Sequence, residues 1–316
     1  MSDVNTIKLL ESAVRRREPL KRVTDAFRLV NGGGDGLEGL VIEQYGRHFS
    51  AQVFDKRWLA KKELLSGFFR DRLDAGYFIV KDRTGPVSSS PEDFKKQIWL
   101  NGASSVTVVR ENGLNFSVDL DDTLNSGLFL DMRGNREIVS GSAKGRRVLN
   151  CFAYTCSFGV YCRARGALEA VNVDISKKNL ERGRLNYRLN SIEPARNELI
   201  RADAFEYLKR AQKKGNSFGL IILDPPSFSR YEGRVFSVKK DMPGLVALAI
   251  SALEPGGYLF VSTNFSGMNS DDLLEMVKSG VGKRKVRRSD SLGQDIDFTA
   301  SGSMPQSCLA ALLVSL

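Results

Sequence analysis

From about residue 125 onward the chain alternates short apolar runs with amphipathic stretches, and this alternation limits the possible folds more than any other feature. The apolar runs predict strands at 147–151, 170–174, 199–203, 219–223 and 258–262. The stretches around them predict helices at 132–140, 157–164, 177–189, 205–212, 245–253 and 271–278. Such alternation with short connections predicts a doubly wound α/β sheet of mostly parallel strands. Two closing strands, at 285–289 and 309–314, are expected to form an antiparallel edge pair.

The first third of the chain has a different pattern. An amphipathic helix is predicted at 9–21, and Asn112-Gly113 between two apolar runs is a strong signal for a β-hairpin. We therefore expect a small α+β domain with an antiparallel sheet at residues 1–118. The α/β domain would then occupy residues 119–316.

The charge balance favours a polyanionic partner. Lys and Arg number 47 against 37 Asp and Glu, a net charge of +10, and an excess of this size favours nucleic acid, although a merely basic surface would also account for it. No run of about 18 apolar residues predicts a membrane helix, and the N-terminus lacks the apolar centre of a signal peptide. We expect a cytoplasmic protein with reduced cysteines.

Metal and triad chemistry are disfavoured by the residue types. The four cysteines have no metal-ligand spacing, so no metal site is predicted. A single histidine, His48, makes a Ser-His-Asp triad or a zinc hydrolase improbable.

Acidic residues follow three consecutive predicted strands: Asp174, Asp203 and Asp224. In an open α/β sheet the ligand binds at the carboxyl ends of the strands. An acid after the second strand can accept both hydroxyls of a ribose, and one after the third can accept an adenine amino group. Each acid could instead cap a helix, Asp174 before Ser176 above all. Three in succession favour an adenosine cofactor.

A nicotinamide cofactor is disfavoured because no G-x-G-x-x-G turn follows the first strand of the sheet. The glycine-rich segment 32–36 precedes strand-like sequence and is expected to be a turn, not a phosphate loop. S-adenosylmethionine, which has adenosine but no pyrophosphate, fits best.

The most specific string is Asp224-Pro225-Pro226-Ser227-Phe228. Its plain interpretation is a turn that ends a strand, since proline cannot continue a ladder. Its functional interpretation is a rigid lip in which Asp224, Pro225 and Pro226 face the methyl donor and Phe228 stacks on a flipped base. Residues 231–234 would then form a mobile lid.

With these residues in hand, the sequence resembles the bacterial large-subunit ribosomal RNA methyltransferases that modify cytosine C5 or guanine N7. The resemblance rests on the segments 24–31, 34–37, 127–133, 135–136, 150–155 and 224–228, on Asp174 and Asp203, and on Gln294-Asp295, which is closer to the guanine-N7 branch. It implies a class I, Rossmann-like methyltransferase sheet with an antiparallel final strand. It also implies cofactor contacts from Phe129, Asp131, Arg133, Asn150, Phe152, Tyr154, Thr155, Asp174, Ile175, Asp203, Ala204 and Asp224.

The chain departs from this family at several points. The N-terminal PUA-type domain of many members is expected to be absent, Cys156 replaces a glycine, and Met132 replaces a polar residue. Ser262-Thr263-Asn264 stands where cytosine-C5 members place a nucleophilic cysteine. Cytosine C5 needs that thiolate, because the carbon is a poor nucleophile until a covalent adduct forms.

The four cysteines do not supply that thiolate: Cys151, Cys156, Cys162 and Cys308 are expected to be small buried residues. Guanine N7 already has an in-plane lone pair, so direct transfer to it is preferred, with an exocyclic amine second.

The sequence therefore predicts an S-adenosylmethionine-dependent enzyme acting on a base of 23S ribosomal RNA or of the precursor large subunit, as a monomer or homodimer. The alternatives are a cytosine-C5 enzyme, a protein glutamine methyltransferase, and a non-catalytic RNA-binding protein on the same scaffold. Two basic stretches, 15–17 and 283–288, could grip RNA phosphates. The second could equally protect an edge strand from pairing.

Overall fold

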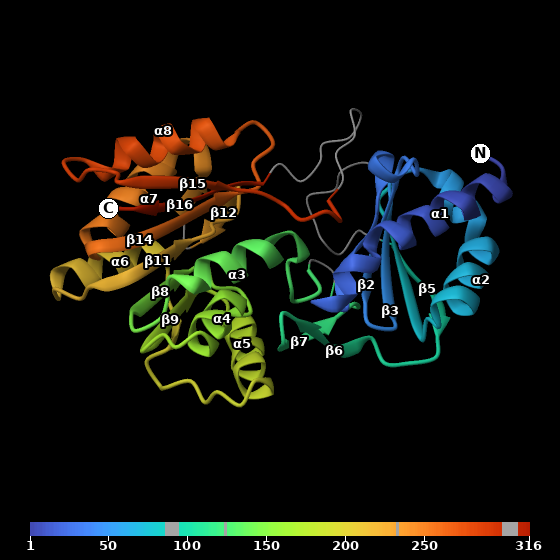
Figure 1. The fold of residues 1–316 in the computed structure, drawn as a ribbon, viewed down its shortest axis with the longest axis horizontal. Coiled ribbons are helices and arrows are strands. Elements are labelled where there is room, and N and C mark those ends of the chain that lie inside the picture. Colours follow the sequence, from blue (N-terminus) through green and yellow to red (C-terminus); the bar gives the residue numbers. More distant parts are fainter. Residues whose placement is uncertain (86–94, 123–124, 232–233, 299–308) are drawn as a thin grey trace. The chain divides into compact units, whose positions relative to one another are not determined.

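The computed structural model describes residues 1–85, 95–122, 125–231, 234–298 and 309–316, with the side chains of 229–235 left out. The chain divides into two compact units (Figure 1). Unit 1 comprises Met1–Asp131 with Asp295–Gln306, and unit 2 comprises Met132–Gln294 with Ser307–Leu316. The division at residue 118 into an RNA-side domain and a methyltransferase domain stays a prediction.

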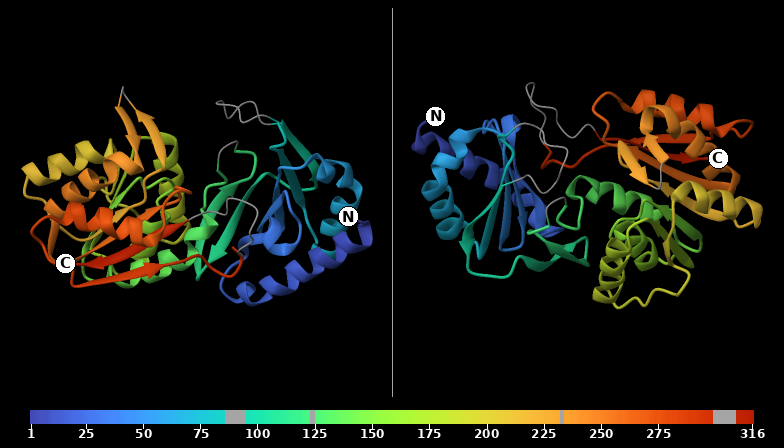
Figure 2. Two further views of the ribbon diagram at one scale, coloured as in Figure 1. Left: turned by 90° about the horizontal axis from the view of Figure 1, so that it is seen from above. Right: turned by 180° about the vertical axis from the view of Figure 1, so that it is seen from behind.

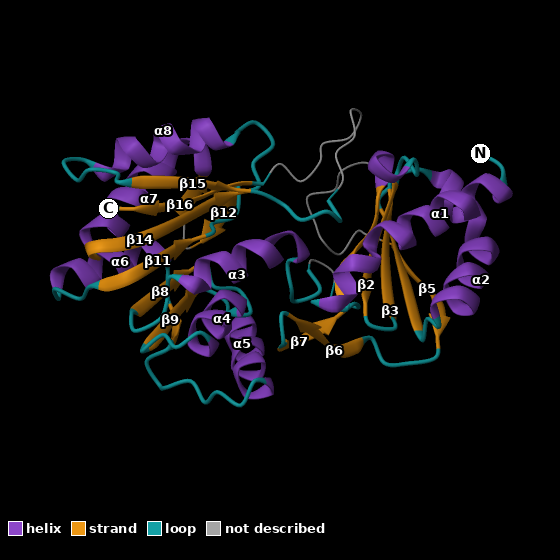
Figure 3. Ribbon diagram, viewed as in Figure 1, coloured by secondary structure: helices purple, strands orange, loops and turns teal. Residues whose placement is uncertain are grey.

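Five of the described strands of unit 1 form a mostly antiparallel sheet in chain order. They are β1 (Ala26–Asn31), β2 (Leu40–Tyr45), β3 (His48–Val53), β4 (Tyr77–Asp82) and β5 (Lys95–Asn101), and β3 and β4 pair in parallel. Helices α1 (Asp3–Arg17) and α2 (Lys62–Leu73) share a core with the sheet (Figure 3). Helix α1 begins earlier than predicted because the Ser2 side chain accepts from the Asn5 N–H and caps it.

The predicted hairpin is confirmed. Strands β6 (Val106–Glu111) and β7 (Leu114–Asp119) pair antiparallel around Asn112 and Gly113, which have φ of 48° and 82°. Two positive φ values in a two-residue loop define the turn type that asparagine followed by glycine favours. The glycine-rich segment is a 3-10 turn, Gly32–Asp35, as expected of a turn.

A short segment between the last two strands of the chain packs into unit 1. The buried Asp297 carboxylate accepts from the Arg28 N–H at 2.9 Å, and its carbonyl accepts from Arg17 Nη2 at 3.0 Å. Arg17 also forms a buried ion pair with Asp35, which accepts from Nη2 at 2.7 Å. Phe298 lies under the Arg28 guanidinium, 4.5 Å from it. Arg17 is therefore unavailable to RNA phosphates, which corrects the expectation for that residue, whereas Arg15 and Arg16 are exposed and phosphate binding by them stays a prediction.

Unit 2 confirms the predicted α/β sheet. Its strand order is β10-β9-β8-β11-β14-β16-β15, parallel except for β16, which runs antiparallel to both neighbours. The strands are β8 (Arg147–Cys151), β9 (Glu169–Asp174), β10 (Leu199–Arg201), β11 (Phe218–Leu223), β14 (Leu253–Thr263), β15 (Arg288–Leu292) and β16 (Ala310–Ser315). The helices are α3 (Arg133–Gly141), α4 (Ser157–Ala164), α5 (Lys177–Leu189), α6 (Ala204–Lys213), α7 (Val238–Ser251) and α8 (Ser270–Val281).

Successive residues of the central strands enter different cores, because side chains alternate across a sheet. In β11, Ile221 and Leu223 pack with α6, α7 and α8, whereas Leu220 and Ile222 pack with α3 and α4. The helices accordingly lie on both faces of the sheet (Figure 1).

The register aligns the carboxyl ends of the parallel strands at one edge. Leu223 of β11 lies opposite Cys151 of β8 and Val261 of β14, and Cys151 lies opposite Val173 of β9. We call this edge the carboxyl edge. A short hairpin, β12 (Phe228–Tyr231) and β13 (Arg234–Ser237), projects from unit 2 (Figure 2). The lid expected at 231–234 has its central residues and its side chains outside the described part of the chain.

Candidate functional site

The loop after β8 has an unusual backbone. Phe152, Tyr154 and Cys156 have φ of 59°, 49° and 61°, in the left-handed region that favours glycine. Each such residue costs about 1 kcal/mol or more, and this strain concentrates at ligand-binding sites. We call residues 152–156 the strand-one loop. It lies at the carboxyl edge, where the sequence predicted cofactor contacts.

Asp174, at the end of β9, anchors this loop. Its Oδ2 accepts from the Tyr154 N–H at 2.8 Å and its Oδ1 from the Ser176 N–H at 2.8 Å. Burial raises the pKa of the Asp174 carboxyl, and the backbone N–H groups oppose that shift. Oδ1 also accepts a long hydrogen bond from Asn179 Nδ2 at 3.5 Å, whereas Oδ2 can accept a second one, so Asp174 keeps the capacity to bind a ribose hydroxyl.

Cys156 fits because α5 has a glycine opposite it. A Cβ atom at Gly183 would lie 2.4 Å from the Cys156 Sγ, so any larger residue would displace the loop. Cys156, at the position where the resemblance implies a glycine, is thus accommodated by a small residue on the next helix.

Asp203 and its neighbours show the structural role that the sequence left open. Asp203 is the N-cap of α6 and accepts from the Glu206 N–H at 3.1 Å. Ala204 is buried, and the carbonyl of half-buried Ile175 accepts from Arg201 Nε at 3.2 Å. Contacts from these residues to a cofactor stay a prediction.

Asn150 and Thr155 support the loop from inside the protein. Asn150 Nδ2 donates to Asn172 Oδ1 at 2.9 Å, and the Thr155 carbonyl accepts from Asn186 Nδ2 at 2.9 Å. Both side chains are at most 2% exposed. The structure shows them as internal supports, and direct contact with the cofactor stays a prediction.

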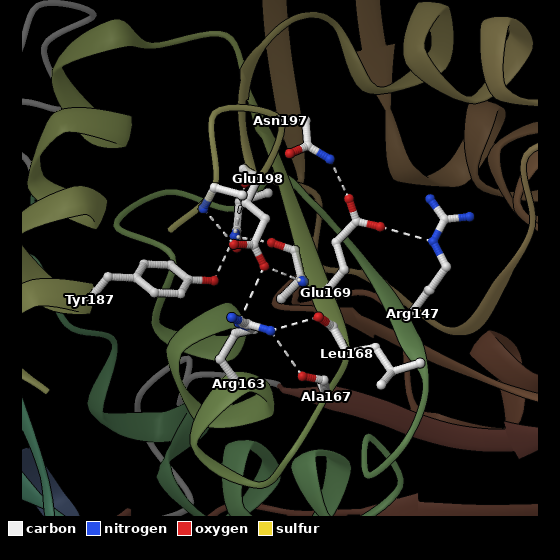
Figure 4. A network of polar contacts seen from close by, with 11 residues as sticks. Arg147, Arg163, Ala167, Leu168, Glu169, Tyr187, Asn197 and Glu198 are labelled. Atoms are coloured by element: carbon white, nitrogen blue, oxygen red, sulfur yellow. Dashed lines mark hydrogen bonds and ion pairs between the residues drawn. The ribbon is translucent and has the colours of Figure 1, made fainter. Parts of the chain in front are cut away.

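This support continues into a buried polar network (Figure 4). Asn172 Nδ2 donates to the Tyr187 hydroxyl at 2.9 Å. The Glu198 carboxylate accepts from the Ala170 and Ala195 N–H groups and forms an ion pair with Arg163 at 3.3 Å. Buried polar groups that have their partners make a rigid base for the loop.

The segment 129–133 lies where the chain passes from unit 1 to unit 2. Phe129 is 40% exposed and Asp131 half-buried, both in unit 1, whereas buried Arg133 begins α3 in unit 2. Their contacts with a cofactor stay a prediction.

The string 224–228 leaves β11 at the carboxyl edge, and two hydrogen bonds join it to the end of β14. The fully buried Ser262 donates its hydroxyl to Asp224 Oδ1 at 2.7 Å, and Ser227 donates to Asn264 Oδ1 at 2.7 Å. We call residues 224–228 the lip.

Within the lip, Pro225 is buried and Pro226 exposed, and the ring of Phe228 is 54% exposed. The sequence did not predict that Ser262 and Asn264 form hydrogen bonds with the lip, although it singled out their positions as the place of a cysteine in related enzymes. The Phe228 ring is accessible for stacking, as the functional interpretation of the lip requires.

The described cysteines are buried thiols, as predicted. Burial raises the pKa of Cys162 to about 12 and shifts the pKa of Cys151 and Cys156 upward as well. Such thiols form little thiolate at neutral pH and are poor nucleophiles. Cys308 lies outside the described residues.

The basic stretch 283–288 lies far from the carboxyl edge. Arg288 begins the edge strand β15 opposite Ser315, which pairs with Tyr258 near the amino end of the parallel run. Tyr258 lies five residues before Thr263, about 16 Å along the strand. The position of β15 at the edge of the sheet fits protection by charge, and phosphate binding there stays a prediction.

Two kinds of feature are absent from the described part of the chain. Within the ranges described above, no helix is long and apolar enough to span a membrane. The same ranges contain no group of three or more His, Cys, Asp or Glu side chains that could hold a metal ion.

Comparison with known proteins places this geometry in a family. Residues 88–303 match the family model of S-adenosylmethionine-dependent methyltransferases. The chain is 30% identical to ribosomal RNA large subunit methyltransferase I of Aeromonas salmonicida, over 86% of this chain and 69% of that protein. It is 34% identical to ribosomal RNA large subunit methyltransferase K of Neisseria meningitidis serogroup B, over 73% of this chain and 67% of that protein.

A solved structure agrees. A methyltransferase in complex with S-adenosylhomocysteine superposes with a TM-score of 0.88 and 27% identity, covering 100% of this chain and 82% of that one. The predicted fold, with its Rossmann-like sheet and antiparallel final strand, and the predicted cofactor are confirmed. The chain belongs to the S-adenosylmethionine-dependent methyltransferase family and is an enzyme that uses this cofactor.

Proposed function

We propose that this enzyme methylates a base of large-subunit ribosomal RNA by direct transfer, with guanine N7 as the preferred acceptor. The observation that carries the proposal is the lip, whose Asp224 is held by a serine at the position expected for a catalytic cysteine. The names of the curated relatives and the net charge of +10 support an RNA substrate.

The strand-one loop and Asp174 fit the cofactor. Asp174 would accept a ribose hydroxyl through its remaining lone pairs. The backbone of Phe152 and Tyr154 would line the site, and Asp203 would accept the adenine amino group. S-adenosylmethionine supplies an electrophilic methyl group on a sulfonium. The role of the protein is therefore to align a nucleophile with that methyl group.

The lip would align the base. Guanine N7 attacks the methyl carbon in line while the bond from that carbon to sulfur breaks, which leaves S-adenosylhomocysteine and a cationic purine. Asp224, fixed by Ser262 at 2.7 Å, would accept from the base and offset the developing positive charge. Phe228 would stack on the ring. No step needs a covalent bond between enzyme and RNA.

This mechanism predicts that the cysteines are dispensable. Replacing each of the four by serine should leave kcat within about tenfold, whereas Asp224→Ala should lower it much further, because it removes the group that faces the charge. Turnover of each variant and S-adenosylhomocysteine binding by calorimetry, as the control for folding, would check this. A cysteine variant that binds S-adenosylhomocysteine but is inactive, or an adduct trapped on RNA containing 5-fluorocytosine, would restore the cytosine-C5 mechanism.

The substrate class has its own test. Rigid Asn/Asp-Pro-Pro-aromatic lips also suit glutamine-modifying enzymes, so protein is the alternative substrate. Enzyme, methyl-labelled S-adenosylmethionine, and total RNA or total protein from a strain lacking the gene would be incubated in parallel. We expect label in large-subunit RNA. Label confined to protein would contradict the proposal, and RNA binding without methyl transfer would favour the non-catalytic alternative.

A further inference from the structure

Asn264 presents an amide at the lip. It follows the last residue of β14, its side chain is exposed, and its Oδ1 accepts the Ser227 hydroxyl at 2.7 Å. Among the described residues, nothing accepts a hydrogen bond from its Nδ2 group. The amide is therefore oriented through its oxygen while two N–H donors stay available at the carboxyl edge.

The hydrogen bond from Ser227 fixes where those donors lie. Ser227 stands between the exposed Pro226 and the exposed Phe228, and the prolines restrict the backbone of this turn. On the other side, Asn264 directly follows the Thr263 that ends a central strand. The amide thus has a defined position at Ser227, one residue before the Phe228 on which the base is proposed to stack.

We propose that Asn264 determines base specificity by donating from Nδ2 to O6 of the target guanine. This inference rests on the proposed function and deepens it. Guanine presents N7 and O6 as neighbouring acceptors on one edge, whereas adenine presents an amine beside N7 and cytosine presents an amine on its corresponding edge. A fixed donor therefore accepts guanine and leaves an unpaired donor facing the amine of adenine or cytosine.

A matched pair of variants distinguishes two roles of Asn264: a hydrogen bond to the target base, and a hydrogen bond to Ser227 that only holds the lip in place. Asn264→Asp keeps an oxygen to accept from Ser227 but replaces the donating amino group by a second oxygen. Ser227→Ala removes the brace and keeps the amide. If Asn264 only braced the lip, Ser227→Ala would be at least as harmful as Asn264→Asp.

The experiment measures kcat/KM for methyl transfer from labelled S-adenosylmethionine to an unmodified 23S ribosomal RNA transcript. Asn264→Asp should lower kcat/KM by about 100-fold and Asn264→Ala by about 10-fold or more, the range expected for loss of a base-reading contact. Ser227→Ala keeps the donors but no longer fixes them, so it should lower kcat/KM by a clearly smaller factor than Asn264→Asp does, about three- to tenfold. Binding of S-adenosylhomocysteine should change less than about twofold in all three, which also reports folding.

Three results would overturn the assignment. Equal rates for the wild type and Asn264→Asp would remove the proposed role of Asn264 and leave the proposed function standing. A loss in Ser227→Ala as large as that in Asn264→Asp would reduce Asn264 to a brace. A wild-type enzyme that binds S-adenosylhomocysteine but methylates no RNA would overturn the proposed function and this inference with it.

Discussion

Asp174 combines a structural cost with a proposed role in cofactor binding. Burial holds the pKa of its carboxyl above the ordinary value, so the ionised form that would bind a ribose is disfavoured in the folded protein. The stability linked to this group is fully present below the unfolded pKa of about 3.9 and falls as pH rises through the higher folded pKa. Asp174→Asn does not titrate. The unfolding free energy of the wild type minus that of Asp174→Asn should therefore fall as pH rises from about 4.

Denaturant unfolding of both proteins between pH 4 and 7 would check this, and a difference that grows with pH would contradict it. Asp174→Asn should also weaken S-adenosylhomocysteine binding by about tenfold or more, since it removes charge-assisted acceptors. Asp290→Asn on the edge strand β15 is the matched control and should bind normally.

Single residues also show how far sequence reasoning reaches. The acids at strand ends could be predicted, because parallel strands end at one edge of the sheet. The hydrogen bond between Ser262 and Asp224 could not be predicted, because it depends on the register of β14 against β11. A shift of one residue in that register would turn the Ser262 side chain to the other face of the sheet.

At the scale of elements, the strand-one loop and α5 are fitted to each other at Cys156 and Gly183. A methyl group at Gly183 would lie 2.4 Å from the Cys156 Sγ and 3.1 Å from its Cβ. Gly183→Ala should therefore cost about 1–3 kcal/mol of stability by overpacking. Because it displaces the loop that is proposed to bind the cofactor, it should also weaken S-adenosylhomocysteine binding.

The double variant Cys156→Gly with Gly183→Ala should recover most of both losses, because the sulfur that clashes is gone. Thermal unfolding and calorimetry of the two single variants and the double variant give the coupling between the positions. Effects that simply add would show that the two residues do not constrain each other.

Elements with clear periodicity were predicted, whereas β5 was missed. Its first residues, Lys95, Lys96 and Gln97, are exposed and polar because β5 is the edge of the unit 1 sheet. Charged residues on an edge strand prevent pairing with other chains, and they also hide the strand from an apolar pattern.

At the scale of the whole molecule, the chain enters unit 1 a second time, and Asp297 fixes it there. Asp297→Ala would leave the part-buried Arg28 N–H without its acceptor and remove a carboxylate near Arg17. We expect a loss of about 1–3 kcal/mol in unit 1. The sequence around Asp297 does not predict this contact, because Asp297 accepts hydrogen bonds from residues more than 260 positions earlier in the chain.

Hydrogen exchange should show this loss as faster exchange in α1 and β1, with β8 and β11 unchanged. Asp290→Ala, which removes an exposed pair with Arg288, is the control and should change stability by less than about 0.5 kcal/mol. Unchanged exchange in unit 1 of Asp297→Ala would show that the segment is not an anchor.

The central proposal for the whole molecule is the direct passage of a methyl group to a guanine nitrogen of large-subunit RNA. The most direct test is mass spectrometry of nucleosides from 23S ribosomal RNA methylated by the purified enzyme. We expect 7-methylguanosine from the wild type and none when Asp224→Ala replaces it. Formation of 5-methylcytidine would contradict the proposal.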